Sequence, residues 1–253
     1  MRKLLFALSL LCSLSMAARD HENITFTSLS SDRFTLIGEG KPVTIVVDTE
    51  FPGVEIAARN LAADFGRVCG TPAKVLTAAD WKSAEGGIIF IGVHNSKTVK
   101  NLAKAKKVST KELTGKTEKY EITVNDGEQT MYVIGSDRRG AIYGTYEISE
   151  QIGVSPWYDW ADAPVAKSKN LSIKRGTYTA GEPAVRYRGI FLNDEAPCLT
   201  SWVKNTYGTN YGDHRFYGRV FELILRLRGN FLWPAMWMWS FYADGPQNRA
   251  TAK

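Results

Sequence analysis

Three consecutive polar residues, Asn193, Asp194 and Glu195, follow a short apolar run and are the strongest candidates for chemistry in this sequence. The run before them, residues 187–192, has the aromatic and β-branched composition of a strand buried on both faces. Because packing occupies both faces of such a strand, polar groups at its carboxyl end are expected to face a cavity. The sequence therefore predicts a polar site at this strand end.

Asp194 and Glu195 supply two carboxyl groups, the kind of group that hydrolyses glycosidic bonds. Such hydrolysis usually takes one carboxyl group to protonate the leaving oxygen and a second to activate water or attack carbon. Adjacent residues of an extended strand point to opposite faces, so these two side chains cannot readily flank one bond together. They are therefore better candidates for binding than for a complete acid and base pair.

The elements after this site predict a strand, helix, strand unit. A loop rich in Gly, Tyr and Asn leads to a helix over residues 216–228, and an apolar strand follows over residues 231–237, in which Pro234 marks the end of regular pairing. Such a unit, with a polar loop after its first strand, is typical of a parallel α/β barrel, whose chemistry lies at the carboxyl ends of the strands. The helix is expected to bury Phe216, Val220, Ile224 and Leu227.

The preceding part of the chain predicts a small mixed sheet covered by helices. Its elements are read from apolar periodicity and from Gly, Pro and Asn turn signals. The expected order is strands 34–37 and 43–47, a helix burying Ile56, Leu61, Phe65 and Val68, a central strand 88–93, a helix 95–105 capped by Asn95 or Ser96, a hairpin of 120–124 and 131–134 around Asn125-Asp126-Gly127, and a helix capped by Ser136 or Asp137 that ends near Gly153. A polar connector over residues 163–183 adds one edge strand at 171–173.

The amino terminus predicts a signal peptide over residues 1–17. Arg2 and Lys3 precede an apolar stretch at 4–14 and a small-residue exit, so the mature chain is expected to begin at Ala18 and to be secreted or periplasmic. No other segment has the ~20 apolar residues that cross a bilayer. Membrane attachment of the mature chain is therefore not expected.

The charge pattern and the cysteines argue against two further classes of protein. The chain has 253 residues and a net charge of +6, with eight lysines between Lys97 and Lys119. These lysines have no interleaved aromatic residues, which favours a solvated surface over a nucleic-acid site. Cys69 and Cys198 lie on different predicted domains, so a disulfide framework is not expected. The three scattered histidines do not build a metal site.

The two barrel motifs, residues 187–195 and residues 221–237, resemble the barrel entry of glycoside hydrolase family 115. That family consists of xylan α-1,2-glucuronidases, which remove glucuronic acid or its 4-O-methyl ether from xylan side chains. The glycine pattern of residues 135–154 resembles the amino-terminal domain that precedes the barrel in several exo-glycosidase families. The resemblance implies a mixed α/β amino-terminal domain over residues 26–178, followed over residues 185–253 by the first βα unit of a truncated (β/α)8 barrel.

The resemblance also implies roles for individual residues. Asp194, with Asn193 and Glu195 beside it, would line the pocket for the glucuronic acid unit, Trp237 would supply an aromatic wall, and Glu150 would reach in from the first domain. The acid and base would belong to later barrel strands, beyond Lys253, so this chain alone is expected to be inactive. Glucuronoxylan is the implied substrate, no cofactor or nucleic acid is implied, and a homodimer of the full-length protein stays open.

Two other interpretations remain. Tandem Asp-Glu is also the working pair of hexosaminidases, although there it belongs to a later strand of the barrel. A non-catalytic carbohydrate-binding module is the second, because Trp233, Trp237 and Trp239 could form a stacking platform for sugar rings. Glu150 as a solvated helix residue and Trp237 as a core residue are the structural alternatives to the pocket roles.

Overall fold

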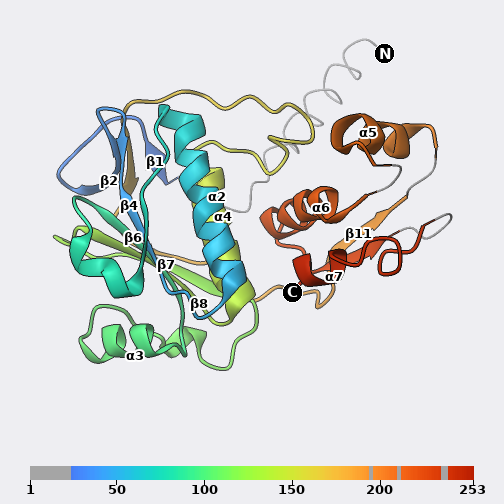
Figure 1. Ribbon diagram of the computed structural model, residues 1–253. Coiled ribbons are helices and arrows are strands. Elements are labelled where there is room, and N and C mark those ends of the chain that lie inside the picture. Colours follow the sequence, from blue (N-terminus) through green and yellow to red (C-terminus); the bar gives the residue numbers. More distant parts are fainter. Residues whose placement is uncertain (1–23, 194–195, 210–211, 235–238) are drawn as a thin grey trace, which may run out of the picture.

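The computed structural model describes residues 24–193, 196–209, 212–234 and 239–253 of the chain. A larger α/β part comes first, and a smaller part follows beside two of its helices (Figure 1). Among the residues described, no helix combines the length and apolar character needed to cross a membrane.

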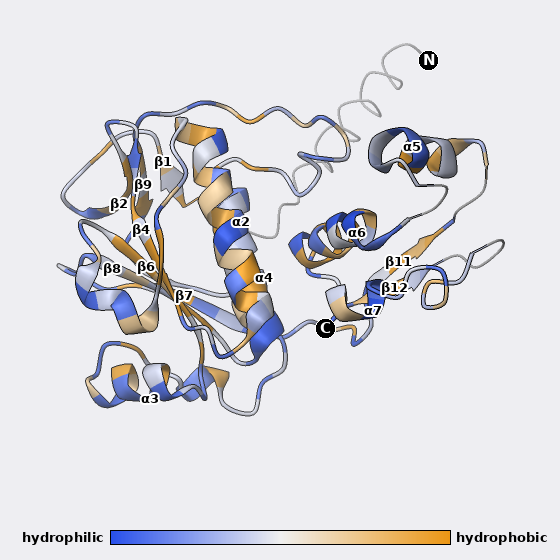
Figure 2. Ribbon diagram, in the orientation of Figure 1, coloured by the Kyte–Doolittle hydropathy of each residue, from blue (hydrophilic) through white to orange (hydrophobic). Residues whose placement is uncertain are grey.

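A six-stranded mixed sheet forms the centre of the first part. β6 (Ile88–Val93) holds an inner position, as its unbroken apolar run predicts. It pairs in parallel with β4 (Thr44–Val47) and β8 (Thr130–Gly135). β7 and β8 form the antiparallel hairpin expected around residues 125–127. Figure 2 shows how largely hydrophobic the central strands are. In spatial order the strands are β10 (Gly176–Tyr178), β7 (Tyr120–Val124), β8 (Thr130–Gly135), β6 (Ile88–Val93), β4 (Thr44–Val47) and β5 (Val75–Thr77).

A second sheet of four antiparallel strands shares the hydrophobic core of the first. β9 pairs with both β1 and β2, so the prediction of an edge strand at 171–173 is wrong. The reason is that β1 pairs with the outer edge of β9. β1 has only two residues, so no hydrophobic alternation in the sequence indicates it. The connector therefore contributes strands to both sheets. The strands of the second sheet, in order, are β1 (Thr25–Phe26), β9 (Leu171–Lys174), β2 (Arg33–Gly38) and β3 (Lys41–Pro42).

Two helices cover one face of the six-stranded sheet and separate it from the smaller part (Figure 1). Leu61, Phe65 and Val68 on the first of them are buried, as their spacing predicts. Ile56 is 58% exposed, which contradicts the prediction, because its side of the helix faces a cleft toward the smaller part. The two helices are α2 (Pro52–Cys69), which ends at Gly70, and α4 (Arg138–Gln151).

Short helices cover the opposite face. Trp81 stacks on Phe90 with ring centroids 4.6 Å apart, and Val99 joins the same cluster. Of the two caps predicted for the helix after Val93, the structure selects Ser96, whose Oγ accepts from the Val99 N–H at 3.2 Å. For α4 it selects Asp137, whose carboxylate accepts from the Gly140 N–H at 2.8 Å. These short elements are α3 (Lys97–Lys104) and the 3-10 helices η1 (Ala78–Ser83) and η2 (Lys111–Leu113).

The smaller part contains the predicted strand, helix, strand unit. β11 and β12 pair in parallel, with Gly189 opposite Phe231 and Leu192 opposite Pro234. The segment expected to be a loop between β11 and the long helix contains an additional helix, whose Val203 is buried in the same core as that long helix. The elements are β11 (Gly189–Leu192), α5 (Cys198–Tyr207), α6 (His214–Arg226), β12 (Phe231–Pro234) and α7 (Asn248–Thr251).

The burial of this unit differs from the prediction at two places. Phe216, Val220 and Ile224 of α6 are buried as expected, but Leu227 follows the helix and is 42% exposed. β11 was expected to be buried on both faces, yet only Ile190 and Leu192 face the core formed with α6, while Phe191 is 56% exposed. The second face, which carries Phe191, is not covered by any element among the described residues, as the exposure of Phe191 and of its neighbour Trp233 shows.

Candidate functional site

Asn193 is the one residue of the predicted polar loop that the structure describes, and it lies at the carboxyl edge of the parallel pair. Asn193 directly follows Leu192 and is exposed, and β12 ends beside it at Pro234. Asp194, Glu195 and Trp237, the other predicted residues of this edge, lie outside the described residues. The structure thus places the strand end that would carry the site, and the roles of these side chains stay predictions.

Glu150 lies in the last turn of α4 and is half-buried. Its charge acts on the hydroxyl of Tyr120. That hydroxyl donates a hydrogen bond to the carboxylate of neighbouring Glu147 at 3.1 Å. Burial and these carboxylates raise the pKa of Tyr120 above its ordinary value, so the phenol stays protonated. No hydrogen bond or ion pair joins Glu150 to Asn193 among the described residues, so a shared pocket for the two remains a prediction.

Aromatic side chains cover the exposed face of the strand pair. Phe191 and Trp233 are opposite one another in register and meet edge to face, with ring centroids 5.6 Å apart. Tyr187 and Phe231 form a similar pair at 6.3 Å. All four rings are about half exposed or more, so the face next to Asn193 is apolar and accessible in this structure.

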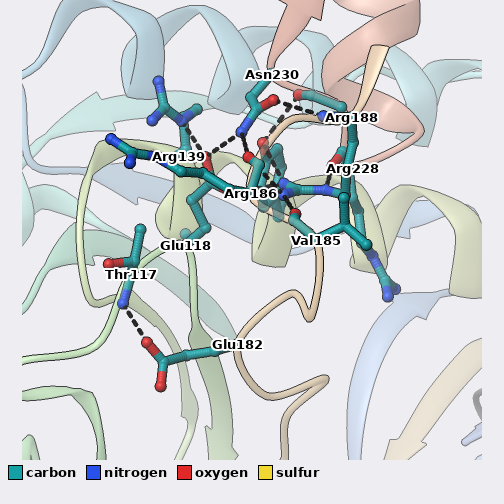
Figure 3. Close-up of polar contacts among 12 residues, drawn as sticks. Thr117, Glu118, Arg139, Glu182, Val185, Arg186, Arg188, Arg228 and Asn230 are labelled. Atoms are coloured by element: carbon teal, nitrogen blue, oxygen red, sulfur yellow. Dashed lines mark hydrogen bonds and ion pairs between the residues drawn. The ribbon is translucent and has the colours of Figure 1, made fainter.

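The opposite, amino-terminal end of the pair is anchored by Glu118, a buried residue in the turn before β7. Its carboxylate accepts from Arg139 Nε at 2.5 Å, Arg188 Nη2 at 2.5 Å and Asn230 Nδ2 at 2.9 Å (Figure 3). Burial by itself would raise the pKa of Glu118, but these three donors outweigh it and hold the pKa below the ordinary glutamate value. Glu118 is therefore an ionised carboxylate shared by three segments. We call Glu118, Arg139, Arg188 and Asn230 the Glu118 cluster.

Tyr143 supports the cluster from α4. Burial, with the charge of Glu118 nearby, raises the pKa of Tyr143 to about 12. The protonated hydroxyl donates to the carbonyl oxygen of Gly229 at 2.9 Å and accepts from Arg188 at 3.3 Å. One turn further along α4, Glu147 forms an ion pair with Arg228. The turn that precedes β12 is thus fixed to α4 by consecutive contacts.

A second polar network joins α6 to α2. Arg226 forms ion pairs with Asp64 and Glu222, each at 2.9 Å, and is only 5% exposed. Tyr158 donates its hydroxyl to Glu222 at 2.9 Å, and Arg219 binds the other oxygen of Glu222 at 2.9 Å. Burial would lower the pKa of Arg226, but the charge of Asp64 raises it above the ordinary value. Each buried charge of this network has an oppositely charged partner, because removing an unpaired charge from water would cost several kcal/mol.

A cleft of about 840 Å³ lies between the first part and the smaller part. α2 and α4 line one wall, while α6, β12, Phe241, Tyr242 and residues 250–253 line the other. Asn193 and Glu150, the two predicted site residues that the structure describes, do not line this cleft. Its wall includes Arg139 and Asn230, which shows that the Glu118 cluster borders the cleft.

The described residues assemble a structural frame rather than a complete catalytic apparatus. In the described ranges, no group of three or more His, Cys, Asp or Glu side chains is placed to hold a metal ion. Three of the buried carboxylates, Glu118, Asp64 and Glu147, have arginine partners and act as anchors. Sequence reasoning missed these anchors, because nothing local distinguishes Glu118 from a solvated turn residue.

Comparisons with known proteins agree with this frame. Residues 180–253 match glycosyl hydrolase family 115, and residues 26–148 match the glycosyl hydrolase family 67 N-terminus. The second match confirms the expected mixed α/β amino-terminal fold. A search of curated proteins finds no match.

Among solved structures, the chain is similar to a novel family GH115 4-O-methyl-alpha-glucuronidase, BtGH115A, with specificity for decorated arabinogalactans. The identity is 30%, the TM-score is 0.73, and the alignment covers 87% of this chain and 28% of that one. This chain therefore spans little more than a quarter of the relative's length.

Two further structures show weaker likeness. A Flavobacterium johnsoniae chitobiase is 13% identical, with a TM-score of 0.45 and coverage of 82% of this chain and 25% of that one. A Streptomyces plicatus beta-hexosaminidase mutant is 15% identical, with a TM-score of 0.46 and coverage of 80% and 31%. Neither bears on the function of this chain. The family match over the strand pair and the 30% identity across 87% of this chain lead to one conclusion: residues 180–253 belong to glycoside hydrolase family 115, and the chain as a whole is similar to a member of that family.

Proposed function

We propose that this chain forms the amino-terminal domain and the sugar-binding barrel entry of an α-glucuronidase. Such an enzyme removes glucuronic acid or its 4-O-methyl ether from the side chains of a polysaccharide. The observation that carries the proposal is the parallel pair β11 and β12, which ends on Asn193 in a segment that matches family 115. Barrel enzymes build their sites at this carboxyl edge.

In this proposal, Asn193, Asp194 and Glu195 bind sugar hydroxyl groups. Amide and carboxylate oxygens accept hydrogen bonds from hydroxyl groups, and the carboxylate bonds are the stronger ones because they are charge-assisted. Trp237 supplies an apolar face for the sugar ring. Glu150 contributes a further acceptor from the amino-terminal domain, for which residues 26–178 are the proposed bounds, with residues 185–253 as the barrel part.

Two polysaccharides are candidates for the polymer that carries the uronic acid. Glucuronoxylan is the substrate implied by the sequence resemblance, whereas the solved relative has specificity for decorated arabinogalactans. Both polymers can carry the same terminal uronic acid, so a pocket at Asn193 would recognise the shared sugar and the surrounding surface would select the backbone. We keep glucuronoxylan as the first substrate to test and decorated arabinogalactan as the second.

Export is proposed from the sequence alone. A protein acting on a plant polysaccharide must meet it outside the cytoplasm, and the amino-terminal pattern at residues 1–17 is typical of a cleaved signal peptide. Amino-terminal sequencing of protein recovered from the periplasm or medium should begin at Ala18. Recovery of the soluble protein with Met1 intact would contradict this.

The decisive assay is release of the uronic acid from each polymer. It is run on this chain and on a protein of the relative's length that contains it, because the chain spans 28% of that relative. In the longer protein, Asp194→Ala should weaken transition-state binding by about 1–3 kcal/mol, the range for leaving a buried partner unpaired. Asp126→Ala, the same charge change at an exposed hairpin turn, is the matched control and should leave activity unchanged.

Three outcomes discriminate the interpretations. Loss of activity in Asp194→Ala but not in Asp126→Ala supports the proposed pocket. Equal activity in both variants removes Asp194 from it. Binding of the polymer by the longer protein without any release of uronic acid would instead favour a carbohydrate-binding module, for which the exposed Phe191 and Trp233 pair offers a stacking surface.

A further inference from the structure

Glu118 lies in a turn, but unlike most acidic turn residues it is buried rather than solvated. It is 4% exposed, and its backbone has φ of +56°, the left-handed region that residues other than glycine adopt at a cost. Its N–H donates to Asp137 Oδ2 at 2.9 Å, so the residue that caps α4 also fixes the backbone of Glu118. The carboxylate is therefore aimed in one direction by a rigid support.

The carboxylate meets the two residues that immediately precede β11 and β12. Arg188 precedes Gly189, Asn230 precedes Phe231, and these two following residues are register partners. Arg188 and Asn230 are also tied to each other: the Arg188 N–H donates to Asn230 Oδ1 at 3.0 Å, and the Asn230 N–H donates to the Arg188 carbonyl at 2.7 Å. Figure 3 shows these side chains converging on Glu118. One carboxylate of the first part thus binds the start of both strands.

We propose that Glu118 is a positioning residue for the sugar site: by holding Arg188 and Asn230, it sets where the carboxyl ends of β11 and β12 lie. This rests on the proposed function as far as the identity of the ligand is concerned. The hold on the strands themselves is independent of that function.

Transmission along the strands follows from their length and pairing. Each strand has four residues, and a strand rises ~3.3 Å per residue, so the five steps from Arg188 to Asn193 span only about 17 Å along an extended backbone. Among the described strands β11 pairs with β12 alone, so no third strand fixes the pair within this part. A shift at Arg188 would therefore be carried to Asn193.

Arg188 reinforces this anchor with its other donors. Its Nε donates to the Arg228 carbonyl at 2.8 Å and its Nη1 to the Val185 carbonyl at 2.7 Å. When Glu118 is removed, this guanidinium keeps its backbone acceptors within the smaller part and its 3.3 Å contact with the Tyr143 hydroxyl, but it loses its ion pair with the first part. The strand pair would then remain formed while its position relative to α4 relaxes.

The first experiment measures hydrogen exchange in the full chain, with mass spectrometry of peptides that cover residues 189–192 and 231–234. Glu118→Ala should speed exchange there by about tenfold or more, and Glu118→Gln, which keeps one acceptor, should fall between it and the unsubstituted chain. Peptides covering β6 and β8 should be unchanged. The matched control is Glu182→Gln, because Glu182 is a nearby exposed acceptor for Thr117 and Lys116 that contacts neither strand.

The second experiment measures uronic acid release in the longer protein that contains this chain. Glu118→Gln should raise KM by about threefold to tenfold with a smaller change in kcat, since the displaced groups bind the sugar, while Glu182→Gln should match the unsubstituted protein. Unchanged exchange in Glu118→Ala would overturn the proposal. Faster exchange with an unchanged KM would also overturn it, because the strands would then be held without any effect on the site.

The two proposals fail in different ways. If the unsubstituted longer protein releases no uronic acid from either polymer, the proposed function is wrong, and the exchange measurement still decides whether Glu118 positions the strand pair. If uronic acid is released but both Glu118 variants behave like Glu182→Gln, the function stands and the positioning role is wrong.

Discussion

Arg226 Nη1 lies 2.9 Å from Asp64 Oδ2 in an ion pair whose side chains are 2% and 0% exposed. Arg226 belongs to the last turn of α6 and Asp64 to α2, so the pair crosses from the smaller part to the first. Arg67 binds the other oxygen of Asp64 at 2.9 Å, and the ring of Tyr146 lies 4.5 Å from the Arg226 guanidinium carbon. The two parts therefore share a buried electrostatic contact in addition to the Glu118 cluster.

Replacing Arg226 by Met should destabilise the chain strongly. Met retains most of the apolar stem but leaves Asp64 and Glu222 without their buried cation, and breaking a buried pair in this way costs about 3–5 kcal/mol. The free energy of unfolding from urea titration is the measurement. The control is Arg59→Met, which removes an exposed pair with Glu55 within α2 and should cost less than about 0.5 kcal/mol. Equal losses in the two variants would show that the buried pair has no special weight.

Stability should fall in acid partly through Glu118. Its pKa is lowered in the folded chain relative to the ordinary value of 4.5, so the folded state favours the ionised form. The stabilisation is complete above pH 4.5 and is lost as the pH falls from there through the lowered folded pKa, because the unfolded chain takes up the proton first. Below pH 4.5, Glu118→Gln should show a shallower loss of unfolding free energy with pH than the unsubstituted chain. Parallel slopes would contradict this.

Gly189→Ala should disrupt the strand pair. A Cβ at this position would lie 1.8 Å from the carbonyl oxygen of Phe231, and backbone cannot yield to such an overlap without breaking the register. Exposure of β12 to hydrogen exchange and a loss of unfolding free energy are the expected results.

Replacing a second glycine, Gly218, should instead raise the free energy of unfolding. At Gly218, in the middle of α6, an added Cβ would meet only Thr251 at 3.7 Å, which is ordinary contact. Because glycine inside a helix is unfavourable relative to alanine by roughly 0.5–1 kcal/mol, Gly218→Ala should stabilise the chain by that amount. A stable Gly189→Ala variant with unchanged exchange would show that the close approach of β11 and β12 is not required.

Residues 24–178 should fold without the smaller part, but with reduced stability. The main core draws its buried residues from Ile24 to Ile173, so a cooperative unfolding transition is expected. Asp64, Glu118 and Glu147 would each lose an arginine partner, and Tyr143 would lose its acceptor.

The loss of unfolding free energy caused by Glu118→Gln tests whether the shortened chain lacks these contacts. Glu118→Gln should cost less unfolding free energy there than in the full chain, because Arg188 and Asn230 are no longer present to be left unpaired. A broad, non-cooperative transition of the shortened chain would show that the first part depends on the smaller one for its core.

The sequence by itself determined the elements whose signals are local. The sequence limited the cap of α4 to Ser136 or Asp137, and in the structure the Asp137 carboxylate is the one that reaches the N–H of Gly140. The hairpin of β7 and β8 follows from the turn at residues 125–127. The periodic apolar residues located α6, and Pro234 marked the end of β12. In each case the determining atoms lie within a few positions of one another, so a pattern along the chain contains them.

The tertiary structure alone decided how these elements are held and which faces they bury. α5 has no strong helical pattern, and its buried Val203 shows that packing on α6 stabilises it. Glu118 meets Arg139, Arg188 and Asn230 across separations of 21, 70 and 112 residues. No local pattern marks such a meeting, because a buried carboxylate is stabilised by whichever donors the fold brings to it. The sequence thus located the strand end that carries Asn193, and the folded chain supplied the anchor that positions it.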